Sequence, residues 1–357
     1  MATEKEKVTM LHGAGGTVMH NFVKEHIVKN FGGLNLTVAE VPLEAMDDAA
    51  VIGDIVFKSD SHAVKPIFFP GGDIGRLSIS GTVNDISALG AEPYALASGV
   101  ILEEGLPLSD LDRILESMRQ TLIEAGVSIV TGDTKVVEKG SLGGCVMNVS
   151  GIGKRSTALE HNLQAVKKYR PNFSARWTLD SNLVVGDKII LSGTIGDHGL
   201  AVLSAQRGLS FGSKIESDVK PLNKVIQRLM GEIGGIVTMK DPTRGGLADA
   251  LNEFTEKSKT GILLQEDKIP IRKDVTIACE MLGLDPLEIG NEGKMLFGVV
   301  PQKAEEALAF LTQTREGKEA QIIGEVTASF NCVAIQTIVG GKRIVSRPIG
   351  DPVPRIC

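Results

Sequence analysis

Long apolar segments are absent from the sequence. A membrane-spanning helix requires about 18 consecutive apolar residues, and no such run occurs along the chain. The N-terminal segment MATEKEKVTM also contains no apolar stretch of signal-peptide length. We therefore expect a cytoplasmic protein that does not bind a membrane.

Positive charge is scarce relative to negative charge. The formal net charge is -6 and the isoelectric point is about 5.6. A protein that binds a nucleic acid duplex neutralises phosphates with a basic face, so this balance argues against nucleic acid as a partner. Small molecules and other proteins are the expected partners.

Cysteine is also rare, and its spacing excludes a structural metal site or a disulfide framework. There is no C-x-x-C pair and no histidine at zinc-finger spacing among the four cysteines, Cys145, Cys279, Cys332 and Cys357. The first three lie in apolar or mixed segments, where a reduced cysteine acts as a small hydrophobic residue. The Walker A pattern GxxxxGK[ST] is absent as well, so any nucleotide must be held another way.

The length and the distribution of apolar runs predict two domains. A chain of 357 residues exceeds the usual size of one compact domain. Periodicity is weakest from residue 155 to residue 187, so we place the junction there. We expect an α/β domain over residues 1–155, an α+β domain over 156–339, and a flexible tail over 340–357.

Apolar periodicity identifies several elements. The stripe of apolar residues from Ser109 to Ala125 predicts a helix with Ser109 as its N-cap. A short strand at 127–130 should then lead into a polar loop, TGDTK, at 131–135. In the second half, strands are expected at KIILSG, IVTMK and MLFGVV, with helices through LAVLSAQ, LADALNEF and PQKAEEALAFL.

Aspartates recur in short polar segments of the first half, in DDAA (47–50), SDS (59–61), GD (72–73), ND (84–85) and GDT (132–134). Carboxylate oxygens are the ligands that Mg²⁺ prefers, and Mg²⁺ bridges phosphate oxygens. The set therefore suggests a magnesium-nucleotide site. Any single aspartate is more often a solvated turn residue, and Asn84 with Asp85 is otherwise a hydrogen-bonded pair near a helix end.

Other polar candidates are weaker when they are taken alone. The HGAGG segment at 12–16 offers backbone amides to a phosphate or is a simple turn before a helix. Lys135 either neutralises phosphate and moves protons or faces water. Glu292, between glycines in GNEGK, is either a carboxylate held at the mouth of a strand or part of a hairpin turn.

The C-terminal tail combines three prolines with a terminal thiol. Pro348, Pro352 and Pro354 exclude helix and favour an extended course. At about 3.1 Å per residue, an arm of this length reaches on the order of 50 Å. Cys357 at its tip is either a stray cysteine or a nucleophile that carries a small group.

Taken together, eight motifs resemble the HypE family of hydrogenase maturation proteins, the carbamoyl dehydratases. They are HGAGG, DDAAV, FFPGGDIGRL, GTVND, TGDTKVVEKG, DPTRGG, NEGK and the terminal PRIC. The resemblance spans nearly the whole chain. Elements like GTVND and GDTK are shared across a wider ATP-using superfamily that includes aminoimidazole ribonucleotide synthetase, selenophosphate synthetase and thiamine-monophosphate kinase. The PRIC ending distinguishes the HypE family within this superfamily. Lys58 and Ser59 precede Asp60, where the family more often has threonine.

The resemblance implies a homodimer formed by the N-terminal domains, with ATP and Mg²⁺ in the cleft between domains and subunits. It implies that the magnesium ligands are Asp48, Asp60, Asp85, Asp133 and Asp241. The nucleotide contacts would add Asn84 and the HGAGG residues His12, Gly13, Gly15 and Gly16. Lys135 and Glu292, with Asp85, would act beside the group carried on Cys357.

The activity implied is ATP-dependent dehydration of a thiocarboxamide on Cys357 to a thiocyanate. The carbamoyltransferase HypF would load Cys357, and the cyanide group would pass to iron on the HypC–HypD complex during nickel-iron hydrogenase assembly. Two alternatives remain open. One is a small-molecule kinase or synthetase of the same superfamily, and the other is a carrier of a cysteine-bound group without catalysis.

Overall fold

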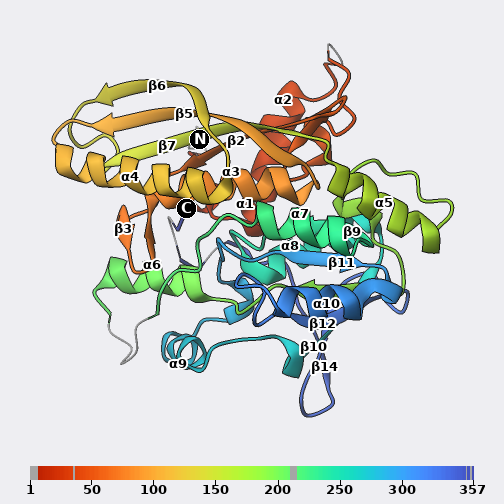
Figure 1. Cartoon of the computed structure of the whole chain (residues 1–357). Coiled ribbons are helices and arrows are strands. Elements are labelled where there is room, and N and C mark those ends of the chain that lie inside the picture. Colours follow the sequence, from red (N-terminus) through yellow and green to blue (C-terminus); the bar gives the residue numbers. More distant parts are fainter. Residues whose placement is uncertain (1–6, 35–36, 210–214, 351, 354–355) are drawn as a thin grey trace, which may run out of the picture.

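The computed structural model describes residues 7–34, 37–209, 215–350, 352–353 and 356–357. Two sheets, each covered by helices, form two stacked domains (Figure 1). The predicted two-domain α/β and α+β architecture is confirmed. None of the helices in the described ranges combines the length and apolar character that a membrane span needs.

The first domain contains a five-stranded sheet in the order β1-β2-β7-β5-β6. Neighbouring strands are antiparallel except β5 and β6, which are parallel. The strands are β1 (Ala50–Ile52), β2 (Ile55–His62), β5 (Glu92–Glu103), β6 (Ile129–Val137) and β7 (Cys145–Lys154). The other elements of this domain are α1 (Gly16–Phe22), α2 (Lys29–Phe31), the hairpin β3 (Phe68–Phe69) and β4 (Gly72–Asp73), α3 (Ile74–Ala88) and α4 (Leu108–Ala125).

The second domain contains a seven-stranded sheet in the order β14-β13-β10-β12-β8-β11-β9, in which only β10 and β13 are parallel neighbours among the described residues. The strands are β8 (Lys188–Leu191), β9 (Ile236–Lys240), β10 (Gly261–Gln265), β11 (Leu296–Val299), β12 (Gln321–Thr327), β13 (Val333–Gln336) and β14 (Lys342–Ile344). The helices are α5 (Thr157–Tyr169), α6 (Asp197–Arg207), α7 (Asn223–Glu232), α8 (Gly246–Ser258), α9 (Lys273–Leu282) and α10 (Ala304–Thr312).

Helix α3 lies between the first sheet and the second domain, and it is buried along almost its whole length (Figure 1). It packs closely on β7 because that strand has glycine where the helix passes. A Cβ on Gly151 would lie 2.5 Å from Leu96 Cδ2 and 2.8 Å from Ile86 Cδ1, well inside van der Waals contact. This close packing holds the last turns of α3 at the domain interface.

Most of the predicted elements are confirmed, and two details are wrong. The predicted helix is α4, but it starts at Leu108 with Pro107 as its N-cap, so Ser109 lies in the first turn. The segment 131–135 is not a loop, since it lies inside β6 and pairs in register with β5, for example Asp133 with Gly99. An edge strand tolerates polar residues because much of its surface faces solvent.

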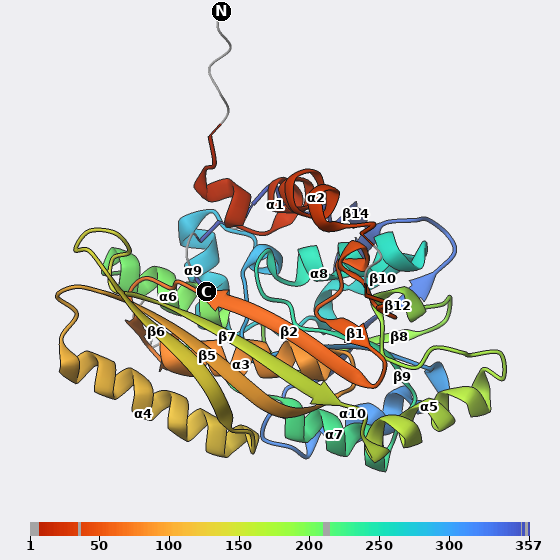
Figure 2. The ribbon, with the colours of Figure 1, turned by 90° about the horizontal axis from the view of Figure 1, so that it is seen from above.

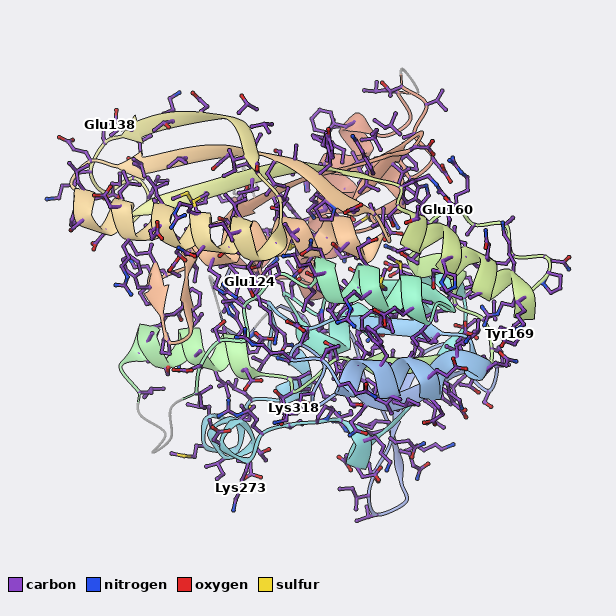
Figure 3. The ribbon with its side chains drawn as sticks, viewed as in Figure 1. Glu124, Glu138, Glu160, Tyr169, Lys273 and Lys318 are labelled. Atoms are coloured by element: carbon purple, nitrogen blue, oxygen red, sulfur yellow. The ribbon has the colours of Figure 1, made fainter. Side chains whose placement is uncertain are left out.

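The predicted domain junction lies between β7, which ends at Lys154, and α5, which begins at Thr157. Helix α5 packs on α7 and β9 of the second sheet. Part of the predicted tail forms β14, which pairs with β13. Viewed from above, the C-terminus lies beside β2 of the first domain (Figure 2). Charged side chains such as Glu138 and Glu160 project from the surface (Figure 3).

The N-terminal cap of α3 provides a test of this packing. Asp73 accepts hydrogen bonds from the backbone N–H groups of Gly75, at 2.8 Å, and Arg76, at 3.0 Å. Replacing Asp73 with alanine leaves these groups without a cap and should lower the free energy of unfolding by about 1 kcal/mol. Urea denaturation at fixed protein concentration measures this loss. Asp73→Asn keeps an accepting oxygen and should lose much less, so an equal loss in both variants would contradict the capping role.

Candidate active site

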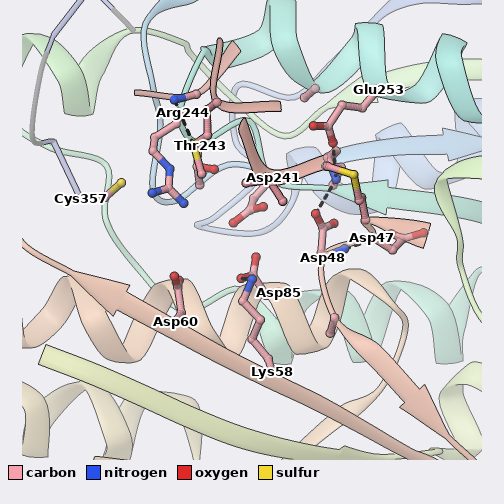
Figure 4. Close-up of a pocket in the computed structure, with 18 of the residues that line it drawn as sticks. Asp47, Asp48, Lys58, Asp60, Asp85, Asp241, Thr243, Arg244, Glu253 and Cys357 are labelled. Atoms are coloured by element: carbon pink, nitrogen blue, oxygen red, sulfur yellow. Dashed lines mark hydrogen bonds and ion pairs between the residues drawn. The ribbon is translucent and has the colours of Figure 1, made fainter. Parts of the chain in front are cut away.

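A cavity of about 450 Å³ lies between the two domains. Strand β2, the end of α3 and the loop at 42–50 contribute from the first domain, while the loop after β9 and helix α8 contribute from the second. The start of α1 and the C-terminal residue complete its wall. Figure 4 shows acidic side chains converging on this space from both domains.

Three carboxyl groups meet at the centre of the cavity. Asp48, Asp85 and Asp241 each place one carboxylate oxygen within 4.8 Å of the others. Burial raises the pKa of Asp85 to about 7. Burial also raises the pKa of Asp48, and burial together with repulsion from Asp85 and Asp48 raises the pKa of Asp241 well above its usual value. The three groups therefore resist simultaneous ionisation unless a cation joins them.

Two buried lysines partly balance this charge. Lys58 Nζ lies 2.6 Å from Asp85 Oδ2. Lys240 Nζ forms an ion pair with Asp48 and lies 3.0 Å from Glu253 Oε2 and 3.2 Å from Asp180 Oδ2. Attraction to these carboxylates raises the pKa of both lysines despite their burial. Both lysines are charged at neutral pH.

The central carboxylates fit a hard divalent cation. Mg²⁺ prefers oxygen ligands and is commonly held by one or two carboxylates together with substrate phosphates. Asp48 Oδ2 is buried and has no hydrogen-bond partner among the described residues, which leaves one oxygen free to bind a metal. A cation among the three groups would also remove the repulsion that raises their pKa values.

A second acidic group, formed by Asp47, Asp48 and Asp180, lies beside the first. Lys257 Nζ is 2.7 Å from Asp180 Oδ2 and also donates to the backbone oxygen of Met46. With Lys240 on its other side, Asp180 is held between two cations, and their attraction keeps its pKa below the usual value although burial opposes this. This group is an ion-pair network that joins the two domains.

The glycine-rich segment reaches the cavity only at its end. Gly15 and Gly16 line the cavity at the start of α1, and Gly16 N–H donates to Asp249 Oδ2 at 2.8 Å. His12 and Gly13 belong to the preceding 3-10 turn and are not among the lining residues. The same segment also holds the tail, because the N–H of Thr17 donates to the backbone oxygen of Pro348 at 2.8 Å.

Cys357 lies in the wall of the cavity, and its side chain points inward in Figure 4. The guanidinium of Arg244 lies nearby. Electrostatic attraction between Arg244 and Cys357 is the main reason why the pKa of Arg244 is raised above its usual value. The end of the chain and the acidic cluster therefore line the same cavity. This arrangement places the sulfur of Cys357 in the space that the carboxylates face.

Glu292 is another buried carboxyl group that lines this cavity. Its side chain lines the cavity, only 2% of the residue is exposed, and Oε1 has no hydrogen-bond partner within the described parts of the chain. Burial and repulsion from Asp60 and Asp218 raise its pKa well above the usual value. Glu292 is thus a stronger base than an exposed glutamate.

Asp60 and Asn84 differ in their placement. Asp60 lines the cavity from β2 and lies 3.4 Å from His62 Nε2. Burial raises the pKa of Asp60, but attraction from His62 and Lys58 outweighs it and lowers the pKa overall. Asn84 does not line the cavity. Its side-chain amide donates a hydrogen bond to the backbone oxygen of Lys220 and accepts one from the backbone N–H of Leu222. These bonds connect α3 to the second domain.

Asp133 and Lys135 lie away from the cavity of their own chain. Both belong to β6, the outermost strand of the first sheet, and both are exposed. Neither lines the cavity. The structure therefore brings together eight of the residues expected at the site, namely Gly15, Gly16, Asp48, Asp60, Asp85, Asp241, Glu292 and Cys357.

Three cationic residues of the site were not predicted. Lys58 was noted only as a departure from a motif, while Lys240 and Arg244 flank the aspartate of KDPTRGG without having been given a role. Charge balance is the signal that points to them, because buried carboxylates need nearby cations. The motif KDPTRGG places both within three residues on either side of Asp241.

Comparisons with known proteins agree with this two-domain arrangement. The N-terminal domain model of AIR synthase related proteins matches residues 46–154, and the C-terminal domain model matches residues 184–335. The two models meet across the cavity, because the first contains Asp48 and Asp85 and the second contains Asp241 and Glu292.

Full-length relatives are also found. Carbamoyl dehydratase HypE of Azotobacter vinelandii is 41% identical, covering 98% of this chain and 97% of that protein. A crystal structure of a HypE–HypF complex is 43% identical with a TM-score of 0.82, covering 92% of this chain and 99% of that one. A HypE structure in complex with ATP is 38% identical with a TM-score of 0.78, and the match covers 98% of this chain and 100% of that chain. This chain therefore belongs to the HypE family of hydrogenase maturation proteins, within the AIR synthase related proteins.

Proposed function

We propose that this protein is an ATP-dependent carbamoyl dehydratase that converts a thiocarboxamide on its own Cys357 to a thiocyanate. The observation that carries the proposal is that Cys357 lines the same cavity as Asp48, Asp85 and Asp241. The curated relative named carbamoyl dehydratase and the relative solved with ATP support it. The product supplies the cyanide ligand for nickel-iron hydrogenase.

The chemistry needs activation of an amide oxygen, which is a poor leaving group. The thiocarboxamide oxygen attacks the γ-phosphate of ATP, and the bond from that phosphorus to the bridging oxygen breaks to release ADP. The C–O bond of the phosphorylated intermediate then breaks as phosphate departs. Loss of the two nitrogen protons leaves S–C≡N on Cys357. The reaction also requires that water be kept away from the activated intermediate.

The residues of the cavity divide this work between them. Asp48, Asp85 and Asp241 would hold Mg²⁺, which would neutralise charge at the phosphates, and Gly15 and Gly16 would offer backbone amides to the nucleotide. Arg244 orients the end of the tail.

Glu292 is the candidate for proton removal. Neutralisation of the negative charge in the cavity would favour the ionised form of Glu292. In that form, the Glu292 carboxylate can accept a proton from the substrate nitrogen. Its raised pKa makes its carboxylate a stronger base than that of an ordinary glutamate.

Three partners follow from this function. HypF loads the carbamoyl group, consistent with the relative solved as a HypE–HypF complex, and the HypC–HypD complex receives the cyanide on iron.

A second copy of the chain is the third partner. Strand β6 offers an exposed edge for it, with Val130 68% and Val136 63% exposed. In such a homodimer, Asp133 and Lys135 would enter the cavity of the partner subunit.

Two alternatives are less well supported. A small-molecule kinase or synthetase of the same superfamily has no use for a terminal cysteine beside its nucleotide site. A carrier without catalysis has no use for the buried carboxylates that fit magnesium. Turnover of a free substrate after deletion of Cys357 would favour the kinase or synthetase.

Loss of the terminal sulfur should abolish the reaction. In Cys357→Ser, consumption of ATP that depends on HypF and its carbamoyl donor should fall to the background rate, because no thiocarboxamide forms. Cys332→Ser is the matched control, since Cys332 lies outside the cavity wall, and it should keep the wild-type rate. Donor-dependent ATP consumption that persists in Cys357→Ser would refute the proposal.

Magnesium binding should weaken as the pH falls. Asp85, with a pKa of about 7, is mostly ionised at pH 8 and mostly protonated at pH 6, and the ionised form binds metal. We expect about tenfold weaker apparent Mg²⁺ affinity at pH 6, as measured by titration at a fixed ATP concentration. Asp85→Asn removes the titrating group and should flatten this dependence. An identical slope in Asp85→Asn would show that Asp85 is not a ligand.

The position of Lys135 can be tested with mixed dimers. Lys135→Met alone should be strongly impaired. A heterodimer of Lys135→Met with Cys357→Ser contains one cavity in which Cys357 and the partner's Lys135 are both intact. It should recover about half of the wild-type rate, measured after tandem-tag purification of the mixed dimer. No recovery would place Lys135 in its own subunit's site or outside the reaction.

A further inference from the structure

The last residues of the chain are anchored outside the acidic cluster. Val353 is fully buried and Ile356 is only 2% exposed. The side chain of Ile356 lies over Gly290, where an added Cβ would come within 2.5 Å of Ile356 Cδ1. The residue immediately before Cys357 is therefore held by apolar packing.

A buried histidine holds the backbone at the same point. His198 Nε2 lies 2.8 Å from the backbone oxygen of Ile356, and its Nδ1 lies 2.8 Å from Ser217 Oγ. His198 has no exposed surface. The function proposed above gives these two residues no role.

The hydrogen-bond partners fix the tautomer of this histidine. A carbonyl oxygen only accepts, so Nε2 must carry the proton that bonds Ile356. Burial lowers the pKa of His198 and favours the neutral ring, so Nδ1 is bare and accepts from the hydroxyl of Ser217. Ser217 Oγ in turn accepts from Val219 N–H at 3.1 Å, which leaves its own proton for His198.

The first domain holds this pair in place. The ring of Phe69 contacts His198 edge to face, with centroids 5.4 Å apart and planes at 90°. The backbone N–H of Ser217 donates to the oxygen of Pro70 at 2.8 Å. Because Phe69 and Pro70 belong to the β3–β4 hairpin, the position of His198 depends on both domains.

We propose that His198 and Ser217 are positioning residues that fix the register of the tail and thereby set the place of the Cys357 sulfur. The proposal rests on the function proposed above. A slip of one residue would move the sulfur by about 3.3 Å, and misplacement of about 1 Å already slows reactions that depend on alignment. Because His198 bonds a backbone oxygen, this hydrogen bond depends on where the chain lies and not on which side chain residue 356 carries.

The reactivity of Cys357 toward iodoacetamide in the ligand-free protein tests the anchoring directly. Peptide mapping by mass spectrometry identifies the alkylated cysteine, and Cys357→Ser confirms the assignment. In His198→Phe, which keeps a flat ring but loses the donor, alkylation of Cys357 should be about fivefold faster because one hydrogen bond no longer opposes release of the tail. His198→Gln keeps an N–H near Nε2 and should stay closer to the wild-type rate.

Ser217→Ala is the milder variant if His198→Phe fails to fold, as judged by thermal unfolding. It should increase alkylation about twofold, because either tautomer of His198 then forms. The double variant His198→Phe with Ser217→Ala should match His198→Phe alone, since both residues act through one hydrogen bond. An unchanged alkylation rate in folded His198→Phe and folded Ser217→Ala would overturn the proposal, and so would full additivity.

Dehydration of the carbamoylated protein separates this proposal from the function on which it rests. The rate in a single turnover should fall at least about tenfold in His198→Phe, with ATP affinity unchanged, because only alignment is lost. Faster alkylation without any dehydration in the wild type would support the anchoring and reject the dehydratase function. Normal dehydration in His198→Phe would reject the positioning role and leave the function standing.

Discussion

Burial of several carboxyl groups around one cavity between two domains is the constraint on which this structure depends. Asp48 and Asp85 come from the first domain and Asp241 from the second, so their mutual repulsion opposes the closing of the two domains. Lys58 and Lys240 offset part of that repulsion, and Lys240 does so across the interface through Asp48 and Asp180. A divalent cation would complete the balance, so cation binding and domain closure favour each other.

The tail adds a second requirement to the same space. A substrate attached to the end of the chain does not need to be bound from solution, because tethering supplies a high local concentration. It must instead be placed accurately. The electrostatic attraction between Arg244 and Cys357, the hydrogen bond between His198 and Ile356, and the hydrogen bond from Thr17 to Pro348 are distributed along the tail and come from separate elements. The backbone contact of Thr17 also places the tail next to the glycine-rich segment that we assign to the nucleotide.

Local sequence signals predicted much of the fold. The apolar stripe of α4, the apolar strands β8, β9 and β11, and the helices α6, α8 and α10 all follow from side-chain periodicity, which the structure retains. The segment TGDTK was taken for a loop because it is polar and contains glycine. Its pairing with β5 is a long-range contact of an edge strand, and no local pattern encodes it.

Most of the acidic residues of the site were predicted, although Asp133 lies outside the cavity and Glu253 was missed, whereas the basic residues were missed. Aspartates were recognised because their motifs resemble a known family, whereas Lys240 and Arg244 acquire meaning only when distant carboxylates surround them. The most direct test of the account is the intact mass of the carbamoylated chain before and after addition of ATP with Mg²⁺. The account predicts an adduct on Cys357 that loses one water only when ATP is present. An adduct whose mass stays unchanged while ATP is hydrolysed would contradict it.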